Sequence, residues 1–417
     1  MTSRSDTTAR PDGTFVWVWL PGATSPVVAG RIDRVAEMYR FAYGSSYLAR
    51  PEAVSLFQPE LPLRQGWLEA PEGLDMAGCL WDASPDSWGQ RVIIARLTGI
   101  QGRAADAVDF DKLTFLLESG SNRIGALDFQ RSATHYEPRS QTASLDELHE
   151  AADALQSGEL REDLARALVD GTAVGGARPK VLVTDHDREY IAKLSTSTDP
   201  YPVVRAEAVG LELARRVGIA VPASRIIQSL GRDVLLVERF DRPGDGTRRM
   251  LISALTMLGF GDFLGARYSS YPETLDVLRK HGASGKHLGR TLFERIVFNI
   301  AISNTDDHAR NHAAFWDGQH LDLTPAYDLC PQLRSGTEAN QAMDISRSGR
   351  RASTFATCIA AAGEYGLTTQ GARDIVDHQV TVIGEAWEDA ADTAELTHVD
   401  RRSLFGRQVL NPYAFSD

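Results

Sequence analysis

The chain has few cysteines and no long apolar run. Its 417 residues include only Cys79, Cys330 and Cys358, an odd number without paired spacing, which excludes a disulfide framework and a zinc site. No run approaches the ~20 apolar residues that a membrane-spanning helix needs. The polar segment 1–13 lacks the apolar stretch of a secretory signal, and we expect it to form a disordered tail. A cytoplasmic protein is expected.

Positive charge is also scarce. The chain has 44 Lys and Arg against 56 Asp and Glu, a formal net charge of −12. Extended contact with nucleic acid requires clustered Lys and Arg, so this balance argues against it. The basic runs 347–351 and 401–402 are short and are expected to be solvated surface. The remaining composition, with 43% hydrophobic residues, is that of an ordinary globular protein of two to three domains.

The most informative segment is Asn304-Thr-Asp-Asp-His-Ala-Arg-Asn311, which is followed by Asp328. In phosphoryl transfer, an Asp orients a hydroxyl nucleophile and accepts its proton, while an Asn and a second Asp hold Mg²⁺. Asp306, Asn311 and Asp328 have the order and spacing for these three roles. Any one of them alone fits a solvated loop on an acidic protein better, whereas the three together favour the site.

The residues between Asn311 and Asp328 predict a hairpin that brings the two together. Segments 311–316 and 320–324 are expected to be strands, and Asp317-Gly318 is a strong turn signal. Protein kinases likewise place a metal-binding Asp after a hairpin.

A nucleotide clamp is expected upstream. The glycine-rich segment that contains Gly175, Gly176 and Ala177 would let backbone N–H groups approach phosphates, and Lys180 adds positive charge. Two strands follow, 181–184 and 189–194. Lys193 in the second is either a charge that solvates an edge strand or a phosphate ligand, and its position after a glycine loop favours the ligand.

Two further predictions concern the surroundings of this lysine. The helix expected over 204–216 offers Glu207, and less favourably Glu212, as its carboxylate partner. The apolar strand that starts at Asp233 ends in Glu238-Arg239-Phe240, where backbone groups could bind an adenine edge. An ordinary core strand that ends in a surface loop fits this composition equally well.

In this order, the motifs resemble the HipA family of bacterial serine/threonine kinases, the toxins of toxin–antitoxin modules. The resemblance covers about residues 15–345 and rests on seven segments: 82–91, 122–127, 174–180, 191–194, 237–242, 304–311 and 323–329. It implies an α+β, bilobal protein-kinase-like fold with an added N-terminal strand-rich subdomain.

The resemblance also implies roles for individual residues. Asp306 would be the catalytic base, and Asn311 and Asp328 would bind Mg²⁺. The ATP site would comprise Gly175, Gly176, Ala177, Lys180, Lys193, Glu238, Arg239, Phe240, His308, Arg310, Asn311 and Asp328. His308 is expected to brace the loop rather than to do chemistry. Some members carry an autophosphorylated serine in the glycine loop, where this chain has Ala173 beside Thr172.

The partners implied are a protein substrate and a HipB-like helix-turn-helix antitoxin that neutralises the toxin and makes most DNA contacts. In the best-known branch of the family the substrate is the glutamyl aminoacyl-tRNA synthetase, and its phosphorylation arrests growth and gives persistence. Two other classes remain open. One is a small-molecule phosphotransferase, and the other is a catalytically silent co-repressor.

We expect four segments along the chain: the tail 1–13, an N-terminal subdomain 14–145, connector helices and a small lobe 146–245, and a helical large lobe 246–417. Helices are predicted over 88–97, 251–258, 271–281, 288–302, 351–365 and 369–388, and two more within 144–168.

Overall fold

The computed structural model describes residues 11–108, 110–139, 143–161, 164–165, 168–169, 178–282, 287–334 and 336–417. The chain divides into two compact units. The first comprises Met1–Thr196, Gln228–Leu251 and Asp317–Gln319, and the second comprises Ser197–Ile227, Ile252–Trp316 and His320–Asp417. Among the described residues, none of the helices combines the length and apolar character needed to cross a membrane. The predicted domain limits at 145 and 245 stay a prediction.

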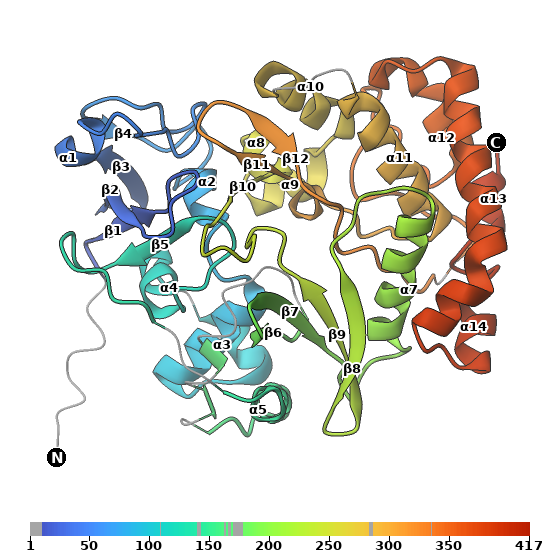
Figure 1. Ribbon diagram of the computed structural model, residues 1–417, viewed down its shortest axis with the longest axis horizontal. Coiled ribbons are helices and arrows are strands. Elements are labelled where there is room, and N and C mark those ends of the chain that lie inside the picture. Colours follow the sequence, from blue (N-terminus) through green and yellow to red (C-terminus); the bar gives the residue numbers. More distant parts are fainter. Residues whose placement is uncertain are drawn as a thin grey trace. The chain divides into compact units, whose positions relative to one another are not determined.

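The first unit contains a five-stranded antiparallel sheet with the order β4-β3-β2-β1-β5 (Figure 1). Its strands are β1 (Gly13–Val18), β2 (Val27–Val35), β3 (Met38–Tyr43), β4 (Trp67–Leu68) and β5 (Leu127–Gln130). Gly30 of β2 is required by packing, since a Cβ there would lie 2.1 Å from the carbonyl oxygen of Ala42. Near the end of the predicted tail, the Arg34 N–H donates to the Asp12 carbonyl at 3.0 Å, and residues 1–10 lie outside the described residues.

Short helices accompany this sheet. They are α1 (Ser45–Leu48), α2 (Gly78–Trp81), α3 (Ser87–Thr98), the 3₁₀ helix η1 (Gly102–Ala107), α4 (Lys112–Glu118) and α5 (Leu145–Ser157). The Asp86 carboxylate caps α3 by accepting the Gly89 N–H at 2.7 Å. Ser144 and Glu147 form a capping box that starts α5. The predicted helix over 88–97 is confirmed, as is the first of the two connector helices.

A four-stranded sheet follows, with the order β6-β7-β9-β8. Its strands are β6 (Lys180–Asp185), β7 (Arg188–Leu194), β8 (Ser224–Ser229) and β9 (Arg232–Glu238). Tyr190, Ala192 and Leu194 of β7 are buried and alternate with more exposed residues, as expected of a strand with one face on a core. The strands predicted over 181–184, 189–194 and from Asp233 are confirmed.

Helices dominate the second unit. They are α7 (Val203–Arg216), α8 (Ala254–Met257), α9 (Asp262–Tyr268), α10 (Tyr271–His281), α11 (Leu288–Ala301), α12 (Phe355–Ala360), α13 (Thr369–Thr393) and α14 (His398–Leu404), with the 3₁₀ helices η2 (Ala309–Asn311), η3 (Ala362–Tyr365) and η4 (Pro412–Phe415). In α13, the long helix in Figure 1, Ile375, Ile383 and Trp387 recur on one buried face. Helix α10 begins where Ser270 accepts the Glu273 N–H, and it matches its predicted bounds.

The predicted hairpin is present and belongs to a sheet of three strands. β11 (Ala313–Trp316) pairs with β12 (Leu321–Leu323), with Trp316 opposite Leu321 and Gly318 at a φ of 99° in the turn. The third strand, β10 (Met250–Ser253), corrects the helix predicted over 251–258. Only α8 is helical there, because pairing with β11 extends the residues before Ser253.

The helix predicted over 351–365 is also wrong at its start. Arg351 lies in extended backbone whose carbonyl accepts the Gln341 N–H at 2.7 Å, and its guanidinium binds Asp344. Thr354 caps α12 instead, by accepting the Thr357 N–H at 3.2 Å. The structure is therefore α+β, with antiparallel sheets and a helical C-terminal part, as predicted.

Candidate functional site

The segment 304–311 follows α11 and is held by two asparagines. At the end of α11, Ser303 adopts a φ of 53°, which turns the chain out of the helix. The Asn304 side chain donates through Nδ2 to Asn299 Oδ1 at 2.9 Å and to the Asp328 carbonyl at 3.1 Å. One buried amide therefore ties the loop to the helix before it and to the segment after β12.

The next fixed point is Asp307, which is 1% exposed. Its Oδ2 accepts three hydrogen bonds, from the Tyr271 hydroxyl at 2.6 Å, Asn299 Nδ2 at 2.7 Å and His312 Nε2 at 2.9 Å. These partners come from α10, α11 and the end of the loop. Three donors on one carboxylate oxygen make Asp307 the anchor of the whole loop.

Sequence reasoning missed this anchor. The available signal was the pair of adjacent aspartates, since consecutive side chains on irregular backbone rarely share one environment. A second signal was Asn299, a polar residue within the apolar run 296–302. The histidine side chain that braces the loop is His312, whereas His308 contributes its backbone, with the Asn311 N–H donating to its carbonyl at 2.8 Å.

Asp306 lies beside this anchor and is only partly shielded from solvent. Its carbonyl accepts the His308 N–H at 2.9 Å and Asn311 Nδ2 at 3.1 Å, so its backbone is fixed from two sides. No donor in the described part of the chain bonds to its carboxylate. A carboxylate on a fixed backbone, with free acceptor capacity, is suited to orienting a hydroxyl and taking its proton.

Asp328 lies within electrostatic reach of Asp306. It adopts a φ of 58°, an uncommon conformation for a residue other than glycine. The neighbouring Tyr327 hydroxyl donates to the Arg310 carbonyl at 2.7 Å, a second link between this segment and the loop. Partial burial raises the pKa of Asp306, and the negative charges of Asp328 and Asp307 raise it further, while His308 lowers it.

These residues fit a magnesium ion. Asn311 Nδ2 donates to the Asp306 carbonyl, which leaves the amide oxygen as a ligand, and Asp328 supplies a carboxylate. Mg²⁺ prefers oxygen ligands and is usually held by one or two carboxylates together with phosphate and water. Accordingly, the described residues contain no cluster of three or more His, Cys, Asp and Glu side chains placed to hold a metal by themselves. A cation would offset the repulsion between Asp306 and Asp328.

The raised pKa of Asp306 predicts a pH dependence. A base must be deprotonated, so we expect activity to fall as pH drops through a pKa higher than the ~3.9 of an ordinary aspartate. Because the folded pKa is raised, the effect on stability has the opposite sign. The free energy of unfolding contributed by Asp306 is greatest below its unfolded pKa and decreases as pH rises through its folded pKa.

The profiles of rate and of denaturant midpoint against pH, for the wild type and Asp306→Asn, check both statements. The variant should lose the pH dependence of stability that comes from this group. A wild-type rate that is flat down to the range of an ordinary aspartate would contradict the raised pKa.

In the first unit, Lys193 lies on β7, opposite Lys180 on β6 and Leu235 on β9. Lys180 is 4% exposed, and its Nζ lies 3.0 Å from Oδ2 of Asp86, the residue that caps α3. Burial raises the pKa of Asp86, while Lys180 acts to lower it. The ion pair gives Lys180 a structural contact that the sequence did not indicate, and its predicted contact with ATP stays a prediction.

Next come the glycine-rich segment, Arg310, and the two glutamates predicted as partners of Lys193. Gly175, Gly176 and Ala177, with Thr172 and Ala173, lie outside the described residues. Arg310 bonds to Asp262, with Nε 2.8 Å from Oδ1. Glu207 is buried on α7, whereas Glu212 binds Arg216 at 2.7 Å within the same helix, so the less favoured partner for Lys193 is already engaged.

The segment Glu238-Arg239-Phe240 follows the end of β9. The Arg239 N–H donates to the Glu189 carbonyl at 2.9 Å, and its carbonyl accepts the Arg242 N–H at 3.3 Å. Its guanidinium is fully buried and bonds to Asn122, Arg123 and Asp241. These bonds give the Arg239 side chain a structural role, and the predicted adenine contacts of Glu238, Arg239 and Phe240 stay a prediction.

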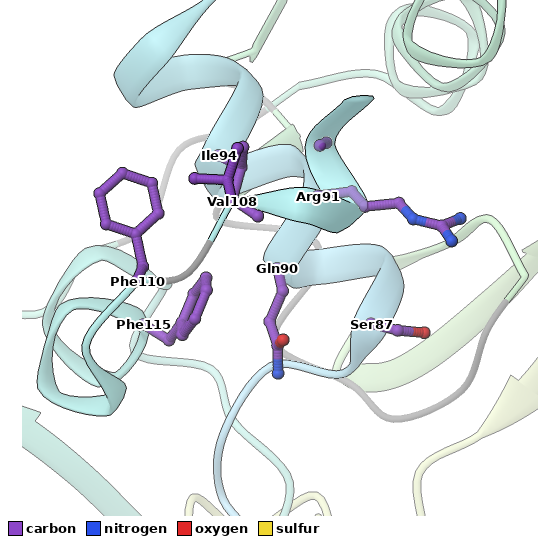
Figure 2. Close-up of a pocket in the computed structure, with 8 residues that line it drawn as sticks. Ser87, Gln90, Arg91, Ile94, Val108, Phe110 and Phe115 are labelled. Atoms are coloured by element: carbon purple, nitrogen blue, oxygen red, sulfur yellow. The ribbon is translucent and has the colours of Figure 1, made fainter. Parts of the chain in front are cut away.

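A cavity of about 240 Å³ lies elsewhere in the first unit, beside α3, η1 and α4 (Figure 2). Its lining consists of Ser87, Gln90, Arg91, Ile94, Ala105, Val108, Phe110 and Phe115. Of the residues predicted to bind ATP or metal, none that the structure describes lines it.

Comparison with known proteins gives two curated relatives. The chain is 25% identical over 267 residues to a Sinorhizobium fredii protein named "Putative kinase Y4mE", covering 57% of this chain and 63% of that protein. It is 22% identical over 179 residues to a Haemophilus influenzae protein named "Putative kinase", covering 38% of this chain and 52% of that protein. The chain thus spans less than two thirds of the length of either relative.

A solved structure shares the fold. It is titled as the Shewanella oneidensis toxin–antitoxin system HipA, HipB and operator DNA complex, and a chain in it matches with a TM-score of 0.66 and 18% identity. The match covers 94% of this chain and 96% of that chain. This agreement confirms the predicted fold class.

Family comparison assigns both parts of the chain. The HipA N-terminal domain matches residues 18–130, and the HipA-like C-terminal domain matches residues 172–387. The second match includes Lys193, Asp306, Asn311 and Asp328. The chain therefore belongs to the HipA family.

Proposed function

We propose that this protein is an ATP- and Mg²⁺-dependent serine/threonine protein kinase of the HipA toxin type. The observation that carries the proposal is the arrangement around Asn304. This residue hydrogen-bonds to the backbone of Asp328, and the same loop presents Asp306 and Asn311, themselves joined by a bond of 3.1 Å. These bonds group the proposed base and the two proposed oxygen ligands for metal in one region of the second unit.

The proposed chemistry relies on positioning and charge. Mg²⁺, when bound, would offset the negative charge of the phosphates. Asn311 and Asp328 would hold it, and Lys193 would contact the phosphates. The Asp306 carboxylate would align a serine or threonine hydroxyl and accept its proton as the hydroxyl oxygen bonds to the γ-phosphorus and the bond to ADP breaks. ATP is a cytoplasmic metabolite, so the reaction is proposed to take place there.

The proposed partners come from the family and from the neighbouring structure. That structure is titled as a complex of HipA with HipB and operator DNA, and we propose a HipB-like antitoxin for this chain. Its net charge of −12 supports DNA contact mainly through such a partner. The substrate is proposed to be a host protein, with an aminoacyl-tRNA synthetase as the first candidate.

The test is a transfer assay with γ-labelled ATP on host lysate, in which the wild type is compared with Asp306→Asn. Label on a serine or threonine of a host protein, present only with the wild type, is the expected result. Label on a small metabolite instead would identify a small-molecule phosphotransferase. A wild type that transfers no label but represses its operator together with an antitoxin would indicate a silent co-repressor.

The metal assignment predicts a shift in magnesium requirement. In Asp328→Asn, an amide replaces the charged ligand, so the Mg²⁺ concentration for half-maximal rate should rise about 10–100-fold. Initial rates measured against Mg²⁺ at fixed ATP give this value. Asp322→Asn, an exposed residue on β12, is the matched control and should leave the requirement unchanged. An unaltered requirement in Asp328→Asn would remove Asp328 from the metal site.

A further inference from the structure

The turn Asn122–Gly125, just before β5, holds the segment that follows β9. Arg239 NH2 donates to the Arg123 carbonyl at 2.6 Å, and Arg242 NH2 donates to the same carbonyl at 2.5 Å. Arg242 NH1 reaches the Gly125 carbonyl at 2.8 Å. In the other direction, the Gly125 N–H donates to Asp241 Oδ2 at 2.8 Å. The backbone of the turn is thus matched, group by group, to the charged side chains after β9.

Asn122 contributes its side chain to this arrangement. Its Nδ2 donates to Glu189 Oε2 at 2.6 Å, and its Oδ1 accepts from Arg239 NH1 at 2.8 Å. Glu189 belongs to β7, and its own carbonyl accepts the Arg239 N–H at 2.9 Å. The Asn122 side-chain amide therefore links Glu189 of β7 to Arg239, the residue immediately after β9.

The charges in this cluster are buried and mutually bonded. Arg239 and Asp241 are each 2% exposed, and Arg242 is 8% exposed. Burial by itself would raise the pKa of Asp241, but the guanidiniums of Arg239 and Arg242 hold it well below its usual range. Buried charges are tolerated when they are paired and hydrogen-bonded, so displacing the segment would be costly. The cluster therefore acts as a clamp on the backbone from Glu238 to Asp241.

Gly125 and Arg123 fix the conformation of the turn. It adopts a φ of 79°, and a Cβ there would lie 3.3 Å from the Leu251 backbone nitrogen. Arg123 is itself fully buried and bonds to Asp128 at 2.8 Å, which fixes the turn from the side of β5. The turn is therefore anchored on the N-terminal sheet while its polar groups face the segment after β9.

We infer that Asn122 is a positioning residue for nucleotide binding, through which the N-terminal domain sets the backbone of Glu238 and Phe240. This inference rests on the proposed function, in which those backbone groups bind the adenine edge. It makes ATP affinity a property of the N-terminal domain as well as of the C-terminal domain that contains the predicted catalytic residues.

The experiment uses the full chain with Asn122→Ala. The dissociation constant for Mg-ATP is measured by titration calorimetry, and KM and kcat by the transfer assay. We expect the dissociation constant and KM for ATP to rise about tenfold, with kcat changed much less, because displaced backbone groups of Glu238 and Phe240 weaken binding of the ground state and the transition state alike. Asn122→Asp retains the acceptor for Arg239 but places a carboxylate oxygen against Glu189 Oε2 in place of the donor, so it should also raise both constants.

The matched control lies at the opposite end of the same strand. Arg232 at the start of β9 bonds to Asp153 of α5 at 2.9 Å. Asp153→Ala removes this ion pair and leaves the segment Glu238-Arg239-Phe240 unchanged. Its affinity for Mg-ATP should equal that of the wild type.

Three results would overturn the inference. In the first, folded Asn122→Ala has lower thermal stability but wild-type affinity for Mg-ATP, which makes the clamp structural only. In the second, Asp153→Ala weakens binding equally, which makes the effect general. In the third, the wild type does not bind Mg-ATP, and the proposed function fails with it. If Asn122→Ala does not fold, the comparison of Asn122→Asp with the wild type decides between support and the first result.

Discussion

Asp306→Asn is expected to reduce phosphoryl transfer by about 10²–10⁴-fold, the usual contribution of a positioned general base. The amide has nearly the same shape as the carboxylate but does not accept the proton of the incoming hydroxyl. The backbone of residue 306 should stay in place, since its carbonyl bonds to the His308 N–H and to Asn311 Nδ2 do not involve the replaced side chain. Single-turnover rates with ATP and the mapped protein substrate measure the loss.

The same variant should not lose stability. The carboxylate of Asp306 has a raised pKa from partial burial and from its acidic neighbours, so its charged form is disfavoured in the folded protein at neutral pH. Removing the charge should leave the denaturant midpoint unchanged or slightly higher, a trade between function and stability that is common at active sites. Near-normal turnover in Asp306→Asn would show that another group is the base. A large fall in stability would show that the residue is structural.

Local patterns in the sequence predicted much of the fold. The helix over 271–281 matches α10, because Ser270 and Glu273 form a start signal and the last turn is basic. The hairpin was predicted from Asp317-Gly318 between two apolar runs. Both signals lie within a dozen residues of the elements that they define.

The errors occur where a distant partner decides the local structure. Segment 251–253 has a helical pattern but becomes β10, because it joins β11 about sixty residues later in the chain. Arg351 was expected to start a helix, but its guanidinium binds Asp344 and its carbonyl pairs with Gln341. Such long-range hydrogen bonds have no periodic signature in a single sequence.

The candidate site also combines features with local sequence signals and features that depend on distant residues. Spacing was sufficient to single out Asp306, Asn311 and Asp328, since the loop and the hairpin are local. Their supports come from far away in the sequence. Asp307 depends on Tyr271, 36 residues earlier, and Arg239 depends on Asn122, 117 residues earlier. The sequence could indicate the chemical groups but not the side chains that hold them in place.

The second large effect is expected at the neighbouring aspartate. Asp307→Ala should lower the free energy of unfolding by about 3–5 kcal/mol, as is typical when one partner of a buried charged network is removed. It leaves the Tyr271 hydroxyl, Asn299 Nδ2 and His312 Nε2 without their shared acceptor. Burial raises the pKa of Tyr271 well above its usual range, and Asp307 adds to the increase, so this hydroxyl remains a donor at any physiological pH. In Asp307→Ala, the Tyr271 hydroxyl therefore stays a buried donor without its acceptor.

Denaturant midpoints and melting temperatures of Asp307→Ala, Asp307→Asn and Asp306→Asn separate the two aspartates. Asp307→Asn keeps one side-chain oxygen for the three donors, so its loss should lie between those of the other two variants. Activity should fall in both Asp307 variants, because Asn299, Asn304 and the loop are linked through the same bonds. If Asp307→Ala were as stable as the wild type, Asp307 would not be the anchor of the loop. The bonds of the Asn304 side chain to Asn299 and to the Asp328 carbonyl would then have to hold the loop together with its backbone.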